Sequence, residues 1–337
     1  MENLKNLPTD ILLDITARLP IESILNCKLV CKLGRYLVSD NPSFYRLHLS
    51  HLNQSSDSGK LSFLVLEGMS KQLHYFEYDE KLDKTLIRRI NFTPTFPFSC
   101  EVLGSINGLI CLYGYDGLTA CICNPVTREN VMLPSIKTDC DIVNVAVYTL
   151  GSSNGWKNVG MLESEFCDLF FHHGVFVNGA LHWMDKRGGM VYVFDLAEEK
   201  FREPISPPTF PPGRMWQHYT LALGVLDGVL YFSIRYDCQI TGCPCSYIWL
   251  LKKQVGNESL GWSKKFLNLR REPLAFTKRG GVLCFDDSSL EIYDPILSAS
   301  RKLVGFSAFT QIIPHKNTFA SLKELGVEDI NLMESAN

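Results

Sequence analysis

A short pattern that recurs along most of the chain limits the possible folds more than any other feature. A two-residue turn (Asn-Gly, Asp-Gly or Gly-Gly) opens a short apolar strand at 107–108, 178–179, 227–228 and 280–281. Such dipeptides favour the tight turns that join antiparallel strands. A second strand then ends in Asn or Asp, at Asn124, Asp195 and Asp294, and a further turn and strand follow. Turn, strand, turn and strand at roughly 50-residue spacing are typical of a β-propeller blade.

The recurring unit therefore predicts an all-β domain, and an irregular β-propeller of about five or six blades is the favoured architecture. A β-sandwich is the alternative, but a sandwich does not need the spacing of strands and turns to recur. Strand-like runs at 61–66, 73–78 and 85–92 precede the first repeat, and 143–157 resembles a partial unit. The Gly-Gly unit at 280–281 is expected to turn as tightly as the others.

The first fifty residues have a different, helical spacing. Pro8 and Pro20 bracket a stretch that predicts one short helix, because proline is tolerated at the start of a helix and not inside it. Thr9 and Asp10 are the expected N-cap and first-turn acid. The segments 22–31 and 33–38 predict two more short helices, and 43–49 closes the unit.

Apolar residues on the first helix form a stripe, since Ile11, Ile15 and Leu19 recur every four positions with Leu12 beside them. A unit of about 45 residues is too small to bury this much apolar surface on itself. Burial of one Leu or Ile side chain is worth about 1.5–3 kcal/mol, so an exposed row would be costly. Either the rest of the chain or another protein must cover the stripe, and the spacing alone leaves both open.

Composition excludes several classes of function. The chain has 337 residues, 46% of them hydrophobic and 20% charged, with a net charge of −3, as expected of a globular protein with two domains. The basic residues form no stripe, so we expect no nucleic-acid partner. Apolar runs are too short for a membrane span, and no signal-peptide core is present. The 12 cysteines are then expected to be reduced thiols in the cytoplasm, the nucleus or both.

Sequence motifs for chemistry are weak. The run 151–155 (GSSNG) fits G-x-S-x-G, but no helix is expected after it, so a hairpin loop is the better interpretation. Cys238, Cys243 and Cys245 lie far in sequence from Cys121 and Cys123, and neither group has zinc-knuckle spacing. We therefore expect no catalytic residue, no metal site and no cofactor.

The N-terminal segments LPTDILLDITARLP, SILNCKLVCK and SDNPSFYRLHLSH resemble the F-box of plant F-box proteins. The resemblance implies that these helices dock on a Skp-type adaptor, which connects them to a cullin–RING ubiquitin ligase. The adaptor-facing residues that it implies are Leu7, Pro8, Ile11, Leu12, Ile15, Leu19, Pro20, Leu25, Val30 and Cys31.

One departure from the F-box pattern follows the Val-Cys-Lys turn. The family often has Ser-Trp there, and this chain has Leu33-Gly34. Gly34 is expected to weaken the third helix by about 1 kcal/mol relative to Ala. Tyr36 or Leu37 is expected to fill the space of the missing Trp.

The later segments LGSINGLICL, CNPVTRENVMLP, GVFVNGALHWM, VYVFDLAEEKF and LEIYDP resemble the F-box-associated domain of plant F-box proteins, a kelch-like domain. This chain has IKTDCDIVNVAVY where the family usually has Gly-Phe-Gly-Tyr-Asp, so one blade is expected to be trimmed. NTFASLKELG resembles the family's short tail, and the residues after Val327 are expected to fray.

Together these features predict α+β architecture in separate domains: an F-box at 1–49, a linker at 50–60, a propeller-like substrate domain at 61–313 and a tail at 314–337. The implied function is that of a non-catalytic substrate-recognition subunit of an SCF-type ubiquitin ligase, whose β domain binds a target protein for degradation. The target-binding residues are not identified by the sequence. Two alternatives remain: a β domain that binds a small ligand or glycan, and an adaptor-binding protein that acts outside a cullin complex.

Overall fold

The computed structural model describes residues 7–41, 43–54, 60–67, 72–90, 100–114, 119–135, 143–162, 174–185, 189–209, 220–237, 244–253, 260–267, 271–285, 288–306 and 309–333. The chain divides into two compact units, which are described separately below. The first unit contains 1–136, 149–155 and 307–337, and the second contains 137–148 and 156–306. The N-terminal helices therefore share a unit with the first strands and with the C-terminal segment.

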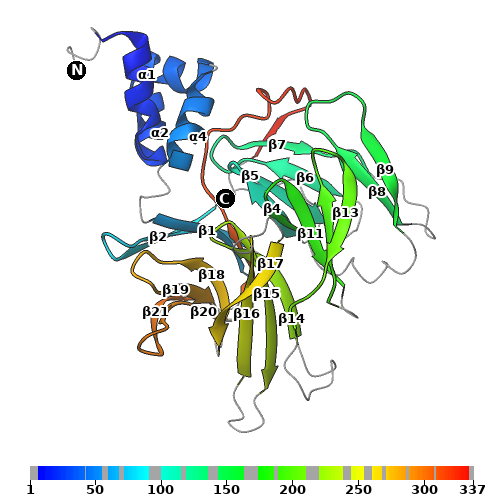
Figure 1. The fold of residues 1–337 in the computed structure, drawn as a ribbon. Helices are drawn as coiled ribbons and strands as arrows, with labels where there is room; N and C mark the ends of the chain where they lie inside the picture. The colour runs from blue at the N-terminus through cyan, green and yellow to red at the C-terminus, as the bar shows by residue number, and fades with distance from the viewer. Residues whose placement is uncertain are drawn as a thin grey trace. The chain divides into compact units, whose positions relative to one another are not determined.

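The helical region begins the first unit (Figure 1). Its elements are α1 (Thr9–Ala17), α2 (Ile21–Val30), α3 (Lys32–Arg35), the π-helix η2 (Tyr36–Asp40) and α4 (Phe44–Gln54). Pro8 and Pro20 are the N-cap residues of α1 and α2, with ψ of 145° and 147° and no side-chain cap. The expected Thr9 cap is thus wrong: Thr9 is already helical, because the extended Pro8 provides the start of the helix.

Helix α4 is longer than the sequence indicated. It runs to Gln54, past the expected start of the linker at residue 50. His51 on the added turn lies 3.1 Å from the Asp14 carboxylate of α1, which ties this turn to the first helix. Strand β1 begins at Lys60, and the remaining linker positions, 55–59, lie outside the described residues.

Two antiparallel sheets complete the first unit (Figure 1). The first has the order β22-β1-β2-β3 and comprises β22 (Phe309–Pro314), β1 (Lys60–Glu67), β2 (Leu73–Asp79) and β3 (Lys84–Arg89). The second has the order β23-β7-β6-β5-β4 and comprises β23 (Asn331–Leu332), β7 (Glu129–Met132), β6 (Ala120–Cys123), β5 (Leu109–Gly114) and β4 (Cys100–Ile106). Leu64, Val102, Ile110, Cys121 and Cys123 are among the buried residues of one core that both sheets share.

The second unit contains three four-stranded antiparallel sheets and a hairpin in its described residues. The first sheet contains β10 (Val175–Val177), β11 (Ala180–Met184), β12 (Val191–Asp195) and β13 (Lys200–Ile205). The second contains β14 (Thr220–Leu226), β15 (Val229–Asp237), β16 (Pro244–Lys253) and β17 (Leu260–Leu267). The third contains β18 (Glu272–Phe276), β19 (Val282–Phe285), β20 (Ser289–Asp294) and β21 (Ala299–Gly305). The hairpin β8 (Val143–Tyr148) with β9 (Trp156–Leu162) is the expected partial unit.

The turn dipeptides form the hairpins that they predicted in three of four cases. Asn107, Asn178 and Asp227 have φ between 50° and 53°, and the glycine after each also has positive φ. Positive φ at both central residues gives a type I′ turn, whose twist matches that of the strands. The Gly280-Gly281 unit differs, because the connection from Phe276 to Val282 is a longer loop closed by the Thr277 hydroxyl, which accepts from the Gly281 N–H at 2.9 Å.

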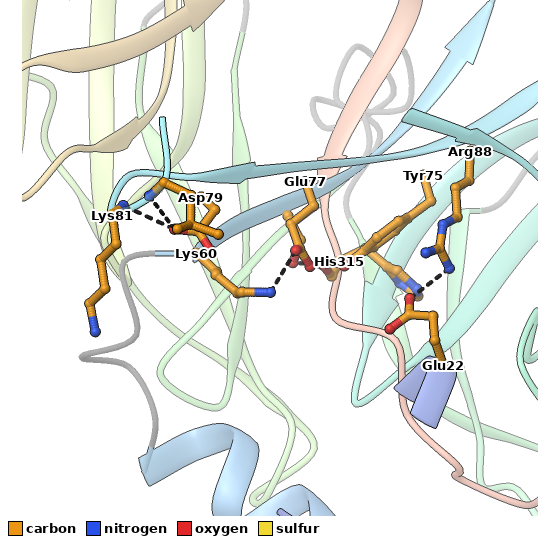
Figure 2. A network of polar contacts seen from close by, with 10 residues as sticks. Glu22, Lys60, Tyr75, Glu77, Asp79, Lys81, Arg88 and His315 are labelled. Carbon is orange, nitrogen blue, oxygen red and sulfur yellow. Dashed lines mark hydrogen bonds and ion pairs between the residues drawn. The ribbon is translucent and has the colours of Figure 1, made fainter. Parts of the chain in front are cut away.

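A second recurring turn follows the third strand of a sheet. The side-chain oxygens of Asp79, Asn124, Asp195 and Asp294 accept a hydrogen bond from the backbone N–H two residues later, at 2.8–2.9 Å. Figure 2 shows this contact between Asp79 and Lys81. Four positions after these acceptors come Asp83, Arg128, Glu199 and Ser298, all with φ of 50–63°. The Asn or Asp that ends a strand therefore shapes the turn that begins the outer strand.

The C-terminal segment is integrated into the first unit, so the expected fraying after Val327 is wrong for residues 328–333, and 334–337 lie outside the described residues. Strand β22 pairs with β1, and β23 pairs with β7. Buried Asn124 donates to the carbonyls of Thr318 and Ala320 at 3.1 and 2.7 Å. Met333, beyond Val327, is buried and its N–H donates to the Arg128 carbonyl. These contacts outweigh the polar composition that predicted a loose tail.

His315 makes this segment sensitive to acid. Its side chain is buried, with Nδ1 2.7 Å from the Ser105 hydroxyl and Nε2 3.1 Å from the Asn317 side-chain oxygen. Burial lowers the pKa of His315 to about 4. The folded chain then binds fewer protons than the unfolded chain below the ordinary His pKa of about 6.5. The stability that neutral His315 confers is complete above that value and declines as the pH falls toward 4.

We expect the free energy of unfolding to fall by at most roughly 3 kcal/mol from this cause between about pH 7 and pH 4.5, since one pKa unit is worth about 1.4 kcal/mol. The His315→Gln variant cannot titrate here and should have a flatter profile, although its stability at pH 7 will be lower. Urea unfolding of both chains across this range measures the difference. Parallel profiles would refute the role of His315.

Candidate functional site

Ile11 and Ile15 on helix α1, together with Leu7 just before the helix, form an exposed apolar stripe, the α1 stripe. Ile11 and Ile15 are each 44% exposed although both are large aliphatic residues. Their four-residue spacing places them one above the other on the same helix face. A large share of this apolar surface therefore remains exposed in the part of the chain that the structure describes.

A second group of exposed apolar side chains follows on α2, α3 and η2. Leu29, Leu33 and Tyr36 are exposed, and Val30 lies beside them. Among these four residues, only Val30 is predicted from the sequence to lie at the adaptor face. Sequence spacing could not have grouped the others, because the extended backbone at Cys31 breaks the helical periodicity between Leu29 and Leu33.

The ten residues expected at the adaptor face divide into three groups. Seven are exposed: Leu7, Pro8, Ile11, Ile15, Pro20, Val30 and Cys31. Leu19 and Leu25 are partly buried and pack against the core of the helical region. Leu12 is only 7% exposed, so the expectation that it faces an adaptor is wrong. One residue along a helix rotates the side chain by about 100°, which turns Leu12 from the stripe toward the buried Thr16.

The opposite side of the helices packs on this chain's own C-terminal segment. Ala17, Ile24, Val38 and Phe44 form a buried cluster together with Phe319. The Phe319 ring lies 5.7 Å from Phe44 and 5.6 Å from His48, in edge-to-face geometry. The chain thus covers one side of the helical region and leaves the α1 stripe exposed. Coverage of the stripe by another protein stays a prediction.

Polar contacts fix the orientation of the helices. Arg18 donates to Asp14 at 2.9 and 3.1 Å, and the His51 ring contacts the same carboxylate. The hydrogen bond from Arg18 is the main cause that lowers the pKa of Asp14, although both side chains are solvated and the pair adds little stability. On α2, Glu22 accepts from Arg88 of β3 at 2.6 Å, and this pair joins the helices to the first sheet (Figure 2).

Gly34 is closely packed, which its low helix propensity alone does not predict. It is buried, and a Cβ at this position would lie 2.1 Å from the Cys27 carbonyl oxygen. Its N–H donates to the Cys31 sulfur at 3.2 Å. Of the two residues expected to fill the space of the missing Trp, Leu37 is buried and Tyr36 is exposed. The close approach of α3 to α2 requires a residue without a side chain.

The Gly34→Ala variant is therefore expected to lose about 1–3 kcal/mol of unfolding free energy, because overpacking outweighs the propensity gain of about 1 kcal/mol. Urea unfolding of the purified chain measures the change. Gly104→Ala is the matched control, since a Cβ there meets no atom within 4 Å. A Gly34→Ala chain as stable as the unmodified one would show that α3 can move away from α2 at no cost.

The motifs that suggested chemistry do not assemble into a site. Residues 151–155 form the loop between β8 and β9, as expected. Cys121 and Cys123 are buried in β6 as part of an apolar core. Cys238 and Cys243 lie outside the described residues. Within the described ranges, no group of three or more His, Cys, Asp or Glu side chains is arranged to hold a metal ion. No described helix is long and apolar enough to cross a membrane.

Comparison with known proteins agrees with the two-part pattern. Residues 4–50 match the family model described as F-box-like, and residues 131–293 match the F-box associated beta propeller domain. The F-box protein CPR1 of Arabidopsis thaliana is 25% identical, with 77% of this chain and 72% of that protein covered. The F-box protein At3g07870 of Arabidopsis thaliana is 33% identical, with coverage of 78% and 72%. The probable F-box protein At1g14315 of the same plant is 22% identical over 86% of this chain and 88% of its own.

Proposed function

The chain belongs to the F-box proteins that carry an F-box-associated β-propeller domain, and from this premise we propose that it is the substrate-recognition subunit of an SCF-type ubiquitin ligase. The predicted fold is confirmed as an N-terminal helical F-box followed by a five-bladed β-propeller, and the β-sandwich alternative is wrong. The blades are the five sheets of four or five strands among the described residues. Proteins of this family are non-catalytic ligase subunits.

The α1 stripe carries this proposal. An F-box implies a Skp-type adaptor, and the half-exposed Ile11 and Ile15 supply the apolar surface that such a partner would cover. Burial of each side chain on the adaptor would contribute about 1 kcal/mol or more, since nearly half of its surface remains to be covered. Leu7, Pro8, Pro20, Val30 and Cys31 extend the proposed contact, and the partly buried Leu19 and Leu25 support it from behind.

The propeller would hold a target protein near the ubiquitin-conjugating enzyme that the cullin–RING part recruits. No chemistry is required of this chain, because holding the target close raises its effective concentration at the reacting thioester. The adaptor, the cullin–RING ligase and the target are the proposed partners, and no nucleic acid or membrane is needed. The proposed location is the cytoplasm, the nucleus or both, where the ligase works on reduced proteins.

Co-expression with a Skp-type adaptor and a cullin tests this function. We expect a complex of one copy each of receptor, adaptor and cullin to co-elute in size-exclusion chromatography at micromolar concentration. If the receptor elutes alone while adaptor and cullin still associate, the ligase function is wrong. A receptor–adaptor pair without the cullin would support the alternative of adaptor binding outside a cullin complex.

A further inference from the structure

One face of the sheet β14–β17 carries an aromatic cluster at the edge of a buried core: Trp249 is 6% exposed and packs with residues of β10–β12, Tyr247 is partly buried, and an exposed lysine lies above both. The cluster contains Tyr236 on β15, Tyr247 and Trp249 on β16 and Lys264 on β17, and it is called the Tyr247–Lys264 shelf. Lys264 Nζ lies 4.0 Å from the centre of the Tyr247 ring and 5.7 Å from that of Trp249. The Tyr247 ring is 5.4 Å from Tyr236 and 5.7 Å from Trp249. The rings thus hold a cation at a defined position on an otherwise mobile side chain.

Two donors of the shelf, the Tyr247 hydroxyl and the Lys264 ammonium, have no acidic acceptor among the described residues. The Tyr236 hydroxyl donates to the Tyr247 hydroxyl at 3.0 Å, so the Tyr247 proton remains free to donate elsewhere. In the part of the chain that the structure describes, neither this proton nor the exposed Lys264 ammonium has an acidic partner. A phenol proton beside a fixed ammonium is a suitable pair of donors for one carboxylate.

The charge of the outer strands points to the same class of ligand. Strands β16 and β17 carry Lys252, Lys253, Lys264 and Lys265, whereas the described acids of β14–β17 and their tight turn are Asp227 and Asp237. The whole chain is slightly acidic, with a net charge of −3, so this is a local excess of positive charge. Such an excess attracts acidic partners and raises their rate of association.

Lysines on an edge strand also keep sheet edges from pairing with other chains, and this role alone would explain Lys265 on β17, the last strand of the sheet. It does not explain why Lys264 is held over two aromatic rings beside an unused hydroxyl. Lys253 lies on the same face as Trp249, four residues further along β16, because side chains alternate along a strand. At about 3.4 Å per residue the positions of Lys253 and Lys264 are about 14 Å apart along the strands, which matches residues i and i+4 of an extended peptide.

We propose that the Tyr247–Lys264 shelf binds an acidic, extended segment of the target protein. One carboxylate accepts from Lys264 and the Tyr247 hydroxyl, and a second, four residues along the segment, faces Lys253. The segment lies along β17, which is the last strand of its sheet and pairs on its outer edge with no other described strand. The proposal rests on the substrate-receptor function, since it names the chemistry of the target.

A fluorescein-labelled decapeptide with two glutamates four residues apart tests the proposal, with the glutamine version as its matched peptide. Binding to the full-length chain in complex with its adaptor is measured by fluorescence anisotropy. We expect the glutamate peptide to bind at least tenfold more tightly than the glutamine peptide. Lys264→Glu should weaken binding at least tenfold, and Tyr247→Phe, which keeps the ring, about threefold. Equal binding of both peptides would overturn the proposal.

Lys252→Glu is the control variant. It makes the same charge change on the same pair of strands, but Lys252 alternates with Lys253 and faces the other side of the sheet. We expect Lys252→Glu to change peptide affinity no more than twofold. A loss of affinity as large as that of Lys264→Glu would show that the peptide is attracted by the overall positive charge and not by the shelf. Adaptor binding is measured for every variant. Peptide binding is also measured with the full-length chain alone. Failure of peptide binding with the adaptor complex intact would refute only the shelf, whereas loss of the adaptor complex while the chain alone still binds the peptide would refute only the ligase function.

Discussion

Replacement of Ile11 and Ile15 together by aspartate is expected to abolish co-purification with a Skp-type adaptor. Both side chains are half-exposed on α1, so the chain itself should fold normally. In the complex, two carboxylates would have to be desolvated against an apolar partner, at a cost of several kcal/mol. A loss of at least about 3 kcal/mol corresponds to a more than hundredfold fall in affinity. Isothermal titration calorimetry with the purified adaptor measures this change.

Two further variants separate the adaptor surface from general damage. Ile296→Asp changes a 91% exposed isoleucine in the turn after β20 and should leave adaptor affinity unchanged. Leu12→Ala removes a buried side chain, so it should lower the unfolding free energy by about 2–4 kcal/mol and affect the adaptor only through stability. If the Ile11 and Ile15 double variant bound the adaptor as the unmodified chain does, the α1 stripe would not be the docking surface.

Local turn chemistry made much of the propeller predictable. Asn107-Gly108, Asn178-Gly179 and Asp227-Gly228 mark type I′ turns because few other residues adopt positive φ at both positions. The sequence also predicts Asn124 and Asp195 as strand ends, and their side chains accept the hydrogen bonds that shape the turns that follow. The equivalent role of Asp79 is not predictable in this way, because no turn dipeptide precedes its hairpin to reveal the repeat.

Long-range contacts could not be predicted in the same way. The pairing of β22 with β1 joins residues about 250 positions apart, and β23 has only two residues, too few to show any periodicity. The burial of Leu12 also escaped prediction, since a stripe two residues wide does not reveal which edge faces the core. The clash that excludes a side chain at Gly34 depends on the distance between α2 and α3, which only the folded chain defines.

Replacement of Phe319 by alanine is expected to be the most destabilising single change in the tail. Phe319 comes from the C-terminal segment, yet its side chain fills the core of the F-box beside Phe44 and Ile24. Loss of a buried phenylalanine typically costs about 3–5 kcal/mol, including the cavity left behind. That is a large part of the roughly 5–15 kcal/mol that stabilises a domain. Urea unfolding measures the loss, and Phe319→Leu should recover about half of it.

The same variant should also weaken adaptor binding, although Phe319 is buried and lies away from the α1 stripe. The cluster around Phe319 includes Ala17 at the end of α1, so a cavity there leaves the helix less firmly held. Leu332→Ala is the control on the same tail: Leu332 is 73% exposed and should change stability by less than about 0.5 kcal/mol. A Phe319→Ala chain with full stability and unchanged adaptor affinity would show that the C-terminal segment does not stabilise the F-box helices.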